Sequence, residues 1–334
     1  MTSLHAPPVL VEVTRGDAVE CRHRGAIAVV DADGRVVFAA GDIDAPVFPR
    51  SAIKPIQALP VIESGAADSE GPEQIALACA SHSGEPQHTE RVAAWLGRLG
   101  LDHRALECGS HMPYFAATAE AMIRSGEQPT ALHNNCSGKH AGIVATCVKC
   151  GDKVAGYMAP SHPAQRRIVA AFEEMCGLDL SRAPRGIDGC GLPQIAIPLR
   201  ALALGMARLG SPDKLAPARA SACKRIGAAM VANPSLVAGT GRFCTRAIAA
   251  AGGAAILKTG AEGNFMGAIP AKGLGFALKI EDGAARASEV TAAKVLLRFA
   301  GLAGAAKDAV EALARTAISN RAGLEVGEVR PTAW

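Results

Sequence analysis

A serine and a lysine three residues apart carry the first candidate chemistry of this chain. The stretch FPRSAIKPIQALP, residues 48–60, places Ser51 before Lys54 at the start of an apolar run. Residues i and i+3 of a helix lie on one face, so we expect the hydroxyl and the amine to touch. A lysine accepts a serine proton only where burial or another cation lowers its pKa. The spacing is therefore compatible with a nucleophile and its base, or with a helix cap beside a surface charge.

A Lys-Thr-Gly run, residues 258–260, supplies a second motif and occurs once. The S-x-x-K spacing by itself is weakly specific, because it recurs at residues 211–214 and 221–224. S-x-x-K at a helix start with a later K-T-G on a strand is typical of penicillin-recognising serine enzymes. Their third element, S-x-N, is missing between Ser51 and Lys258. This absence disfavours a β-lactamase.

Three further stretches hold polar side chains among glycines. CASHSGEPQH, residues 79–88, offers the hydroxyls of Ser81 and Ser83. HNNCSGKHAG, residues 133–142, and IDGCGLP, residues 187–193, each place a cysteine in a setting unusual for a core thiol. Two thiolates suit Zn²⁺ or a similar metal. The alternative is a polar turn with a buried thiol.

The elements that must position these residues follow from hydrophobic periodicity. Val- and Ile-rich runs predict strands at 9–16 and 25–41, with DADG, residues 31–34, as a hairpin turn. Spacing near 3.6 predicts helices at Ser51–Glu63, Gly71–Ala80, Gln87–Leu99, Thr118–Ser125, Lys139–Cys150, Pro163–Cys176, Leu192–Leu209 and Pro212–Val231.

Strand patterns return near the C-terminus, at 254–260, 265–273 and 275–283, before a helix at 288–302 with Ser288 as its cap. Strands at both ends of the chain with helices between them predict an α+β fold. We expect one antiparallel sheet built from both termini, a helical lobe over roughly 51–233, and a single domain spanning residues 1–334.

Composition narrows the functional classes. The 334 residues are 49% hydrophobic, which is enough for a proper core. The net charge of +4, without a long basic run, disfavours nucleic acid as a partner. Apolar segments are too short for a membrane span, and the N-terminus lacks the pattern of a signal peptide. We therefore expect a cytoplasmic protein whose ten cysteines are reduced.

Five motifs together resemble one known family. RSAIKP, CASHSGE, NNCSGKHAG, DGCGLP and KTGAEG are similar, in this order and over nearly the whole chain, to the rhizobial-type (class 3) L-asparaginases of the asparaginase II family. The resemblance implies a homodimeric enzyme with a fold like that of the serine β-lactamases and penicillin-binding proteins. It also implies hydrolysis of the side-chain amide of L-asparagine to L-aspartate and ammonia.

The resemblance also implies roles for particular residues. Two Ser-Lys pairs form the active site of this family, and Ser51–Lys54 matches the first. Lys258 matches the lysine of the second pair, whose serine falls in SHSGE, with Ser83 favoured over Ser81. A zinc ion is held in the family by two cysteines and a lysine. The matching residues are Cys136, Lys139 and Cys190, with Asp188 close by.

These matches lead to a hypothesis with open alternatives. Ser51 attacks the amide, Lys54 takes its proton, and Ser83 with Lys258 delivers a proton to the leaving nitrogen; which serine forms the covalent bond is left open. Arg50 or Lys139 would face the substrate carboxylate, and Asp188 or Glu85 its ammonium. Rival interpretations are a glutaminase, a hydrolase of β-lactam type, or a non-catalytic protein that zinc stabilises.

Overall fold

The computed structural model describes residues 6–334, which form two compact units interleaved along the chain. The sheet unit comprises the residues up to Ala52, Ala196–Ser211 and Ala250–Trp334. The helical unit comprises Ile53–Ile195 and Pro212–Ala249. The helical part thus lacks 196–211 and gains 234–249 relative to the expected range 51–233. That both units make one domain stays a prediction.

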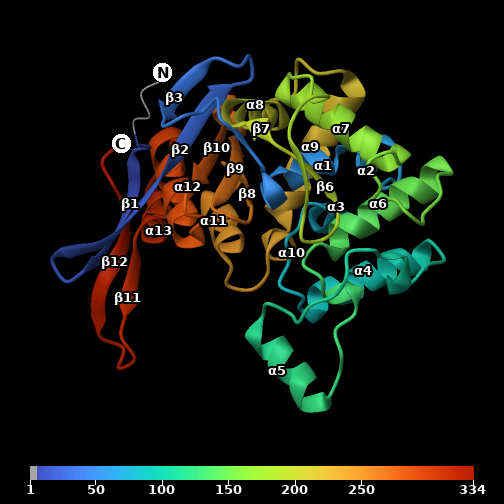
Figure 1. The fold of residues 1–334 in the computed structure, drawn as a ribbon, viewed down its shortest axis with the longest axis horizontal. Coiled ribbons are helices and arrows are strands. Elements are labelled where there is room, and N and C mark those ends of the chain that lie inside the picture. The colour runs from blue at the N-terminus through green and yellow to red at the C-terminus, as the bar shows by residue number, and fades with distance from the viewer. Residues whose placement is uncertain (1–5) are drawn as a thin grey trace. The chain divides into compact units, whose positions relative to one another are not determined.

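The sheet unit is built on eight strands: β1 (Val9–Arg15), β2 (Ala18–Asp31), β3 (Val36–Ala40), β8 (Ile256–Thr259), β9 (Asn264–Ile269), β10 (Leu274–Ile280), β11 (Thr316–Ser319) and β12 (Glu325–Pro331). Their order is β11-β12-β1-β2-β10-β9-β8, with β3 paired to β2 (Figure 1). Every pairing is antiparallel. One sheet from both ends of the chain, as predicted, is therefore confirmed.

The long strand β2 joins the two halves of this sheet. Its first half pairs with β1, and its second half pairs with β3 and β10. Gly25 lies at the change of partner, where an added Cβ would stand 2.2 Å from the Lys279 carbonyl oxygen. The predicted DADG turn joins β2 to β3, with Gly34 at φ +88°.

Three helices belong wholly to the sheet unit. The helix α8 (Leu199–Gly210) packs on β2, β9 and β10, and α12 (Ala285–Phe299) packs on β1, β9, β10 and β12. The third, α13 (Gly304–Ala314), packs on α12 (Figure 1). Two short strands, β4 (Pro46–Val47) and β7 (Ile197–Pro198), pair beside them, and η4 (Pro270–Lys272) is a 3₁₀ turn.

Two sequence predictions about these helices are corrected. The helix expected from Leu192 begins only at Leu199, because Pro193 and Pro198 remove backbone donors and the intervening residues form short strands. Ser288 does not cap α12, since the helix begins three residues earlier. The Ser288 hydroxyl instead donates to the carbonyl oxygen of Ala285 within the helix.

The helical unit contains α1 (Lys54–Gln57), α2 (Leu59–Glu63), α3 (Pro72–Ala78), α4 (Pro86–Arg98), α5 (Ala116–Ser125), α6 (Ser137–Cys150), α7 (Pro163–Cys176), α9 (Pro217–Ala232) and α10 (Pro234–Val237). The helix α11 (Phe243–Ala251) continues two residues past Ala249, where this unit ends, and β5 (Arg185–Ile187) pairs with β6 (Pro193–Ile195). The 3₁₀ turns η2 (His103–Ala105) and η3 (Ala131–His133) belong to this unit, whereas only Ile53 of η1 (Arg50–Ile53) does. A proline opens five of these helices, where its missing N–H costs least.

The buried helix α6 is the centre of the helical unit and contacts α2, α3, α4 and α7. Gly138 lets it approach α3, because an added Cβ would stand 2.4 Å from the Leu77 carbonyl oxygen. The single helix expected over 51–63 is divided into η1, α1 and α2, with Pro55 and Pro60 each at the start of a new piece.

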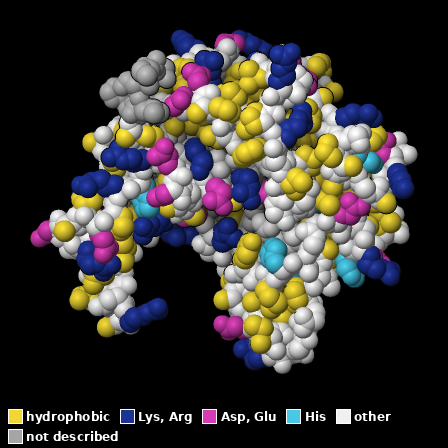
Figure 2. All heavy atoms as spheres, in the orientation of Figure 1, with side chains coloured by type: hydrophobic (Ala, Val, Ile, Leu, Met, Phe, Trp, Pro, Cys, Tyr) yellow, Lys and Arg dark blue, Asp and Glu magenta, His cyan; other side chains and the backbone are white. Residues whose placement is uncertain are grey.

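Charged side chains of both signs are interspersed over the face shown in Figure 2. All ten cysteines lie within residues 6–334 and are free thiols. No helix in this part of the chain is long and apolar enough to cross a membrane.

Candidate active site

In the sheet unit, the K-T-G segment packs against the segment that carries Ser51. An added Cβ at Gly260 would stand 2.7 Å from the Pro49 carbonyl oxygen and 3.0 Å from the Ala52 nitrogen. Only glycine permits this approach, so the residue type fixes the end of β8 beside the backbone around Ser51. Lys258 on β8 is 1% exposed, and its amine donates to the Thr259 carbonyl oxygen at 2.8 Å.

Two strained residues flank this contact. Arg50 (φ +52°) and Glu262 (φ +57°) are the non-glycine residues with left-handed backbone in residues 6–334. Their side chains form a long ion pair, with Arg50 Nη1 4.0 Å from Glu262 Oε1. The left-handed conformation costs about 1–2 kcal/mol per residue. Such strain is concentrated at functional sites, and here it directly precedes Ser51.

In the helical unit, Lys54 is buried and fully hydrogen-bonded. It opens α1, three residues after Ser51 on η1, and is 1% exposed. Its Nζ lies 2.5 Å from the Ala80 carbonyl oxygen, 3.0 Å from Ser81 Oγ and 3.1 Å from Cys136 Sγ. An ammonium group has three N–H donors, so each can be satisfied. Ser81 is thus a hydrogen-bond partner of the first lysine, while the pairing of Ser83 with Lys258 stays a prediction.

Ser83 is held by a loop that sequence reasoning missed. Its Oγ donates to the Ala238 carbonyl oxygen at 3.0 Å, and the Ser81 N–H donates to Val237. Gly239 in this loop has φ +123°, and an added Cβ would stand 2.3 Å from Ser83 Oγ. The Gly-Thr-Gly run at residues 239–241, between two helical stretches, is the signal that could have identified it.

Glu85 fixes the same loop from the other side. Its carboxylate accepts hydrogen bonds from the Thr240 N–H at 2.8 Å, the Thr240 hydroxyl at 2.6 Å and the Gln87 amide at 3.0 Å. Burial acts to raise the pKa of Glu85, but these hydrogen bonds lower it below the ordinary value. The carboxylate is thus fully engaged, which argues against the alternative that Glu85 faces the substrate ammonium.

The two cysteines and the lysine expected to bind metal come together. Cys136 lies at the N-cap of α6, Lys139 lies in its first turn, and Lys139 Nζ is 3.0 Å from Cys190 Sγ. The Cys190 thiol is also within hydrogen-bond reach of Cys136. This hydrogen bond, followed by the charges of Lys139 and Lys54, holds the pKa of Cys136 well below its usual value despite burial.

The same contacts shift the pKa values of the other two groups. Burial alone would lower the pKa of Lys139, but the sulfurs of Cys136 and Cys190 raise it above the ordinary value. The hydrogen bond to Cys136 and burial raise the pKa of Cys190. The Cys190 sulfur thus contacts both Cys136 and the Lys139 amine.

His140, next to Lys139, is held by Tyr157. The Tyr157 hydroxyl accepts from the Glu107 N–H at 2.9 Å and lies 2.6 Å from His140 Nδ1. Which of the two groups donates in the second contact depends on the histidine tautomer. Burial, then the charges of Lys139 and Lys54, hold the pKa of His140 well below its usual value. Within residues 6–334, the fully buried Nε2 of His140 has no hydrogen-bond partner.

The donor set fits a thiophilic metal if the lysine takes part. No three His, Cys, Asp or Glu side chains in residues 6–334 are grouped so as to hold a metal ion. Asp188 accepts from the Gly189 N–H at 2.8 Å and from Gln194 at 3.2 Å. Two sulfurs and one amine remain, a set that suits zinc once Lys139 loses its proton.

The crowding around Gly239 predicts a difference between two glycine substitutions. Gly239→Ala forces a Cβ into Ser83 Oγ, whereas Gly241→Ala, also at positive φ, meets nothing within 4 Å. Both variants carry backbone strain, but we expect Gly239→Ala to lower the free energy of unfolding by a further ~1–3 kcal/mol. Urea unfolding monitored by circular dichroism measures the difference. Equal values for the two variants would contradict the packing described.

The buried carboxylate of Glu85 predicts a pH-dependent contribution to stability. Its folded pKa lies below the unfolded value, so its stabilisation is present above the unfolded pKa and lost as pH falls through the folded pKa. We expect Glu85→Gln to lower the free energy of unfolding by about 1–3 kcal/mol at pH 7, and by less near pH 4. Urea titrations at both pH values test this. Glu127→Gln, on an exposed residue, is the control, and a pH-independent loss would count against the assignment.

Comparisons with solved structures return similar chains at low identity. One is "Mglu" in its native form, 15% identical with a TM-score of 0.44; the match covers 82% of this chain and 63% of that chain. A β-lactamase from Mycobacterium bovis is 14% identical with a TM-score of 0.41; the match covers 83% of this chain and 95% of that chain. D-alanine carboxypeptidase AmpC from Burkholderia cenocepacia is 13% identical with a TM-score of 0.40; the match covers 82% of this chain and 93% of that chain.

No curated protein matches the chain. The family description of L-asparaginase II matches residues 11–331, which include every candidate site residue discussed above. The match confirms the resemblance inferred from the five motifs: the chain belongs to the L-asparaginase II family and is an amidohydrolase.

Proposed function

We propose that this amidohydrolase is an L-asparaginase, which converts L-asparagine to L-aspartate and ammonia through a serine nucleophile. Family membership supports the reaction class. The observation that carries the assignment furthest is the buried Lys54 amine, hydrogen-bonded to Ser81 and Cys136. A lysine that is shielded from water and lies three residues from Ser51 is better suited to act as a base than an exposed lysine.

The proposed reaction has two steps. Lys54 would act after losing one proton to solvent, because an ammonium nitrogen has no free lone pair. Ser51 Oγ attacks the amide carbon of the substrate, and the neutral Lys54 amine takes the hydroxyl proton. Ser83 with Lys258 passes a proton to the departing nitrogen, so ammonia leaves and an aspartyl ester remains on Ser51. Water then hydrolyses the ester. Backbone N–H groups at the start of η1 would stabilise the oxyanion, each worth about 3 kcal/mol.

Hydrogen bonds within the helical unit support fixed positions for the Lys54 amine and the Ser83 hydroxyl. Ser81 would orient the Lys54 amine, and the loop at 237–241 would keep Ser83 in place. Arg50 would bind the substrate carboxylate and Asp188 its ammonium. Lys139 would add a second cation near the carboxylate in the metal-free site. Because Glu85 is fully hydrogen-bonded, we leave it out of substrate binding. A homodimer stays a prediction, as does a cytoplasmic location.

We further propose that Cys136, Lys139 and Cys190 would hold a zinc ion. The bound ion would supply a fixed positive charge to the site. The chain's own contribution is to bring two sulfurs and an amine together at the start of α6. Loading would require Lys139 to release its proton, since an ammonium nitrogen has no free lone pair.

Trapping the covalent intermediate tests the nucleophile. Acid quenching during turnover of L-asparagine, followed by peptide mass spectrometry, should find the aspartyl ester on the peptide with Ser51. We expect Ser51→Ala and Lys54→Ala to lower kcat by about 10³-fold or more. Ser125→Ala, on the exposed helix α5, is the control. An ester on the peptide with Ser81 and Ser83, or full activity of Ser51→Ala, would refute the assignment.

A comparison of substrates separates the candidate activities. Ammonia release by the unmodified protein is measured with L-asparagine and with L-glutamine, alongside turnover of a chromogenic β-lactam. Preference for L-asparagine supports the proposal. Preference for glutamine indicates a glutaminase, turnover of the β-lactam alone indicates a hydrolase of that type, and no turnover at all favours a zinc-stabilised binding protein.

Zinc content after dialysis tests the metal site. We expect about one zinc ion per chain in the unmodified protein and a loss of at least tenfold in zinc affinity for Cys190→Ser, because a hydroxyl is a poor ligand for zinc. The control is Cys150→Ser at the exposed end of α6. Elemental analysis provides the readout, independent of activity. Equal zinc content in both variants would exclude Cys190 as a ligand.

A further inference from the structure

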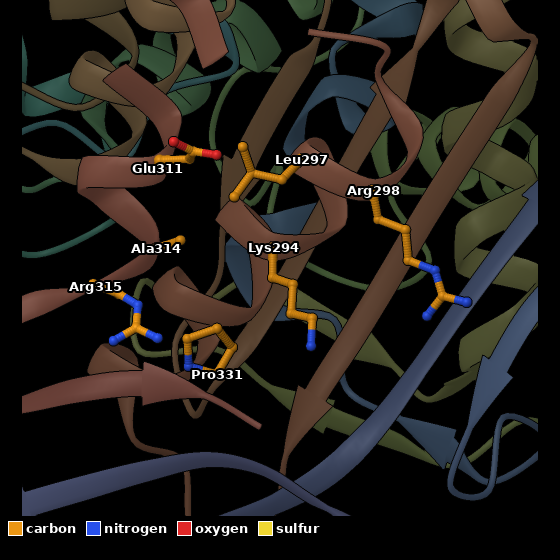
Figure 3. A pocket seen from close by; sticks show the side chains of 7 residues that line it. All are labelled: Lys294, Leu297, Arg298, Glu311, Ala314, Arg315 and Pro331. Atoms are coloured by element: carbon orange, nitrogen blue, oxygen red, sulfur yellow. The ribbon is translucent and has the colours of Figure 1, made fainter. Parts of the chain in front are cut away.

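The sheet unit contains a cavity that the proposed reaction does not use. Its volume is about 510 Å³, which is within the usual range for small-molecule sites. Side chains from α12, α13 and the end of β12 line it (Figure 3). All of them lie within Ala250–Trp334, and none is a candidate catalytic or metal-binding residue.

The lining combines apolar and basic groups. Leu297, Ala314 and Pro331 supply apolar surface, and the alkyl stems of the basic side chains extend it. In Figure 3, Lys294 and Arg315 extend on either side of Pro331. The cavity therefore offers an apolar wall with cationic groups at its margin.

Two of the cations lack acidic partners. Lys294 and Arg298 lie one turn apart on α12, a spacing at which like charges destabilise a helix. Neither forms an ion pair with any carboxylate in residues 6–334. Instead, the Lys294 amine donates to the Thr332 carbonyl oxygen and lies 4.2 Å from the centre of the Trp334 ring. Arg298 Cζ lies 4.3 Å from the centre of the Phe38 ring.

The other two charges of the cavity are already balanced. Arg315 donates to both carboxylate oxygens of Glu328, at 2.9 and 3.0 Å. Glu311 lies 3.4 Å from Lys307. The cavity thus has an excess of two positive charges. In keeping with this, burial and then the charge of Arg298 lower the pKa of Lys294.

We propose that this cavity binds a small carboxylate with an apolar body, such as a medium-chain fatty acid. The carboxylate would bridge Lys294 and Arg298 and relieve their repulsion, while the hydrocarbon would cover Leu297, Ala314 and Pro331. Charge complementarity favours an anion, and the apolar wall favours a hydrocarbon body over a small hydrophilic ion. The site is independent of the proposed asparaginase activity.

Trp334 provides a direct probe of binding. The chain has two tryptophans, and Trp95 is fully buried in the helical unit. Trp334 stacks on Phe38 at 5.7 Å and lies under the Lys294 amine. A carboxylate at Lys294 changes the field at the indole ring, so titration with decanoate below its micelle concentration should change tryptophan fluorescence to saturation. Trp334→Phe should abolish the signal, and isothermal titration calorimetry measures the affinity independently.

Matched variants separate a local site from a general charge effect. We expect Arg298→Gln to weaken decanoate binding about tenfold or more, since a charge-assisted hydrogen bond is lost. Arg124→Gln, which removes the same charge from exposed α5, should leave binding unchanged, and decanol should bind more weakly than decanoate. The proposal is overturned if calorimetry detects no saturable binding, if decanol binds as tightly, or if Arg298→Gln binds as tightly as the unmodified protein.

Discussion

The burial of one cation constrains the helical unit. Lys54 is almost fully removed from water, and an unpaired ammonium in such a place would cost several kcal/mol. Three acceptors offset that cost: the carbonyl oxygen of Ala80 just after α3, the hydroxyl of Ser81 and the sulfur of Cys136. These acceptors come from two further segments of the chain, so α1, the SHSGE segment and the start of α6 must keep their positions relative to one another.

Glycines allow this close arrangement of segments at two places. Gly138 allows the first turn of α6 to approach the last turn of α3, and Gly239 allows its loop to cover Ser83. Glu85 then ties the loop down through the backbone and hydroxyl of Thr240. The polar side chains of this region are thus held by backbone contacts and by a buried carboxylate. Such rigidity suits a site that must position reacting groups closely.

The sulfur cluster extends the same network. Cys136 contacts the Lys54 amine and lies within hydrogen-bond reach of Cys190, whose sulfur contacts Lys139, so the charges of two lysines act on Cys136. Burial and the same two lysines hold the pKa of His140, one turn along α6, well below its usual value. Any change of charge at the cluster, including the loading of a metal, is therefore felt by the amine proposed as the base.

The sequence by itself determined the order of the motifs, the family, the β2–β3 hairpin and the sheet built from both ends, because these depend on local periodicity and short spacings. The sequence did not predict β11 and β12. Glycine has a low strand propensity, so Gly327 argues against a strand at this place. In the structure, however, β12 lies so close to β1 that an added Cβ at Gly327 would stand 2.0 Å from the Thr14 carbonyl oxygen. Only the tertiary structure decided that Ser81 contacts Lys54, that Glu85 is fully engaged and that Cys136 meets Cys190. Those contacts join residues up to 155 positions apart, and no local pattern encodes which distant hydroxyl or carboxylate a buried charge will find.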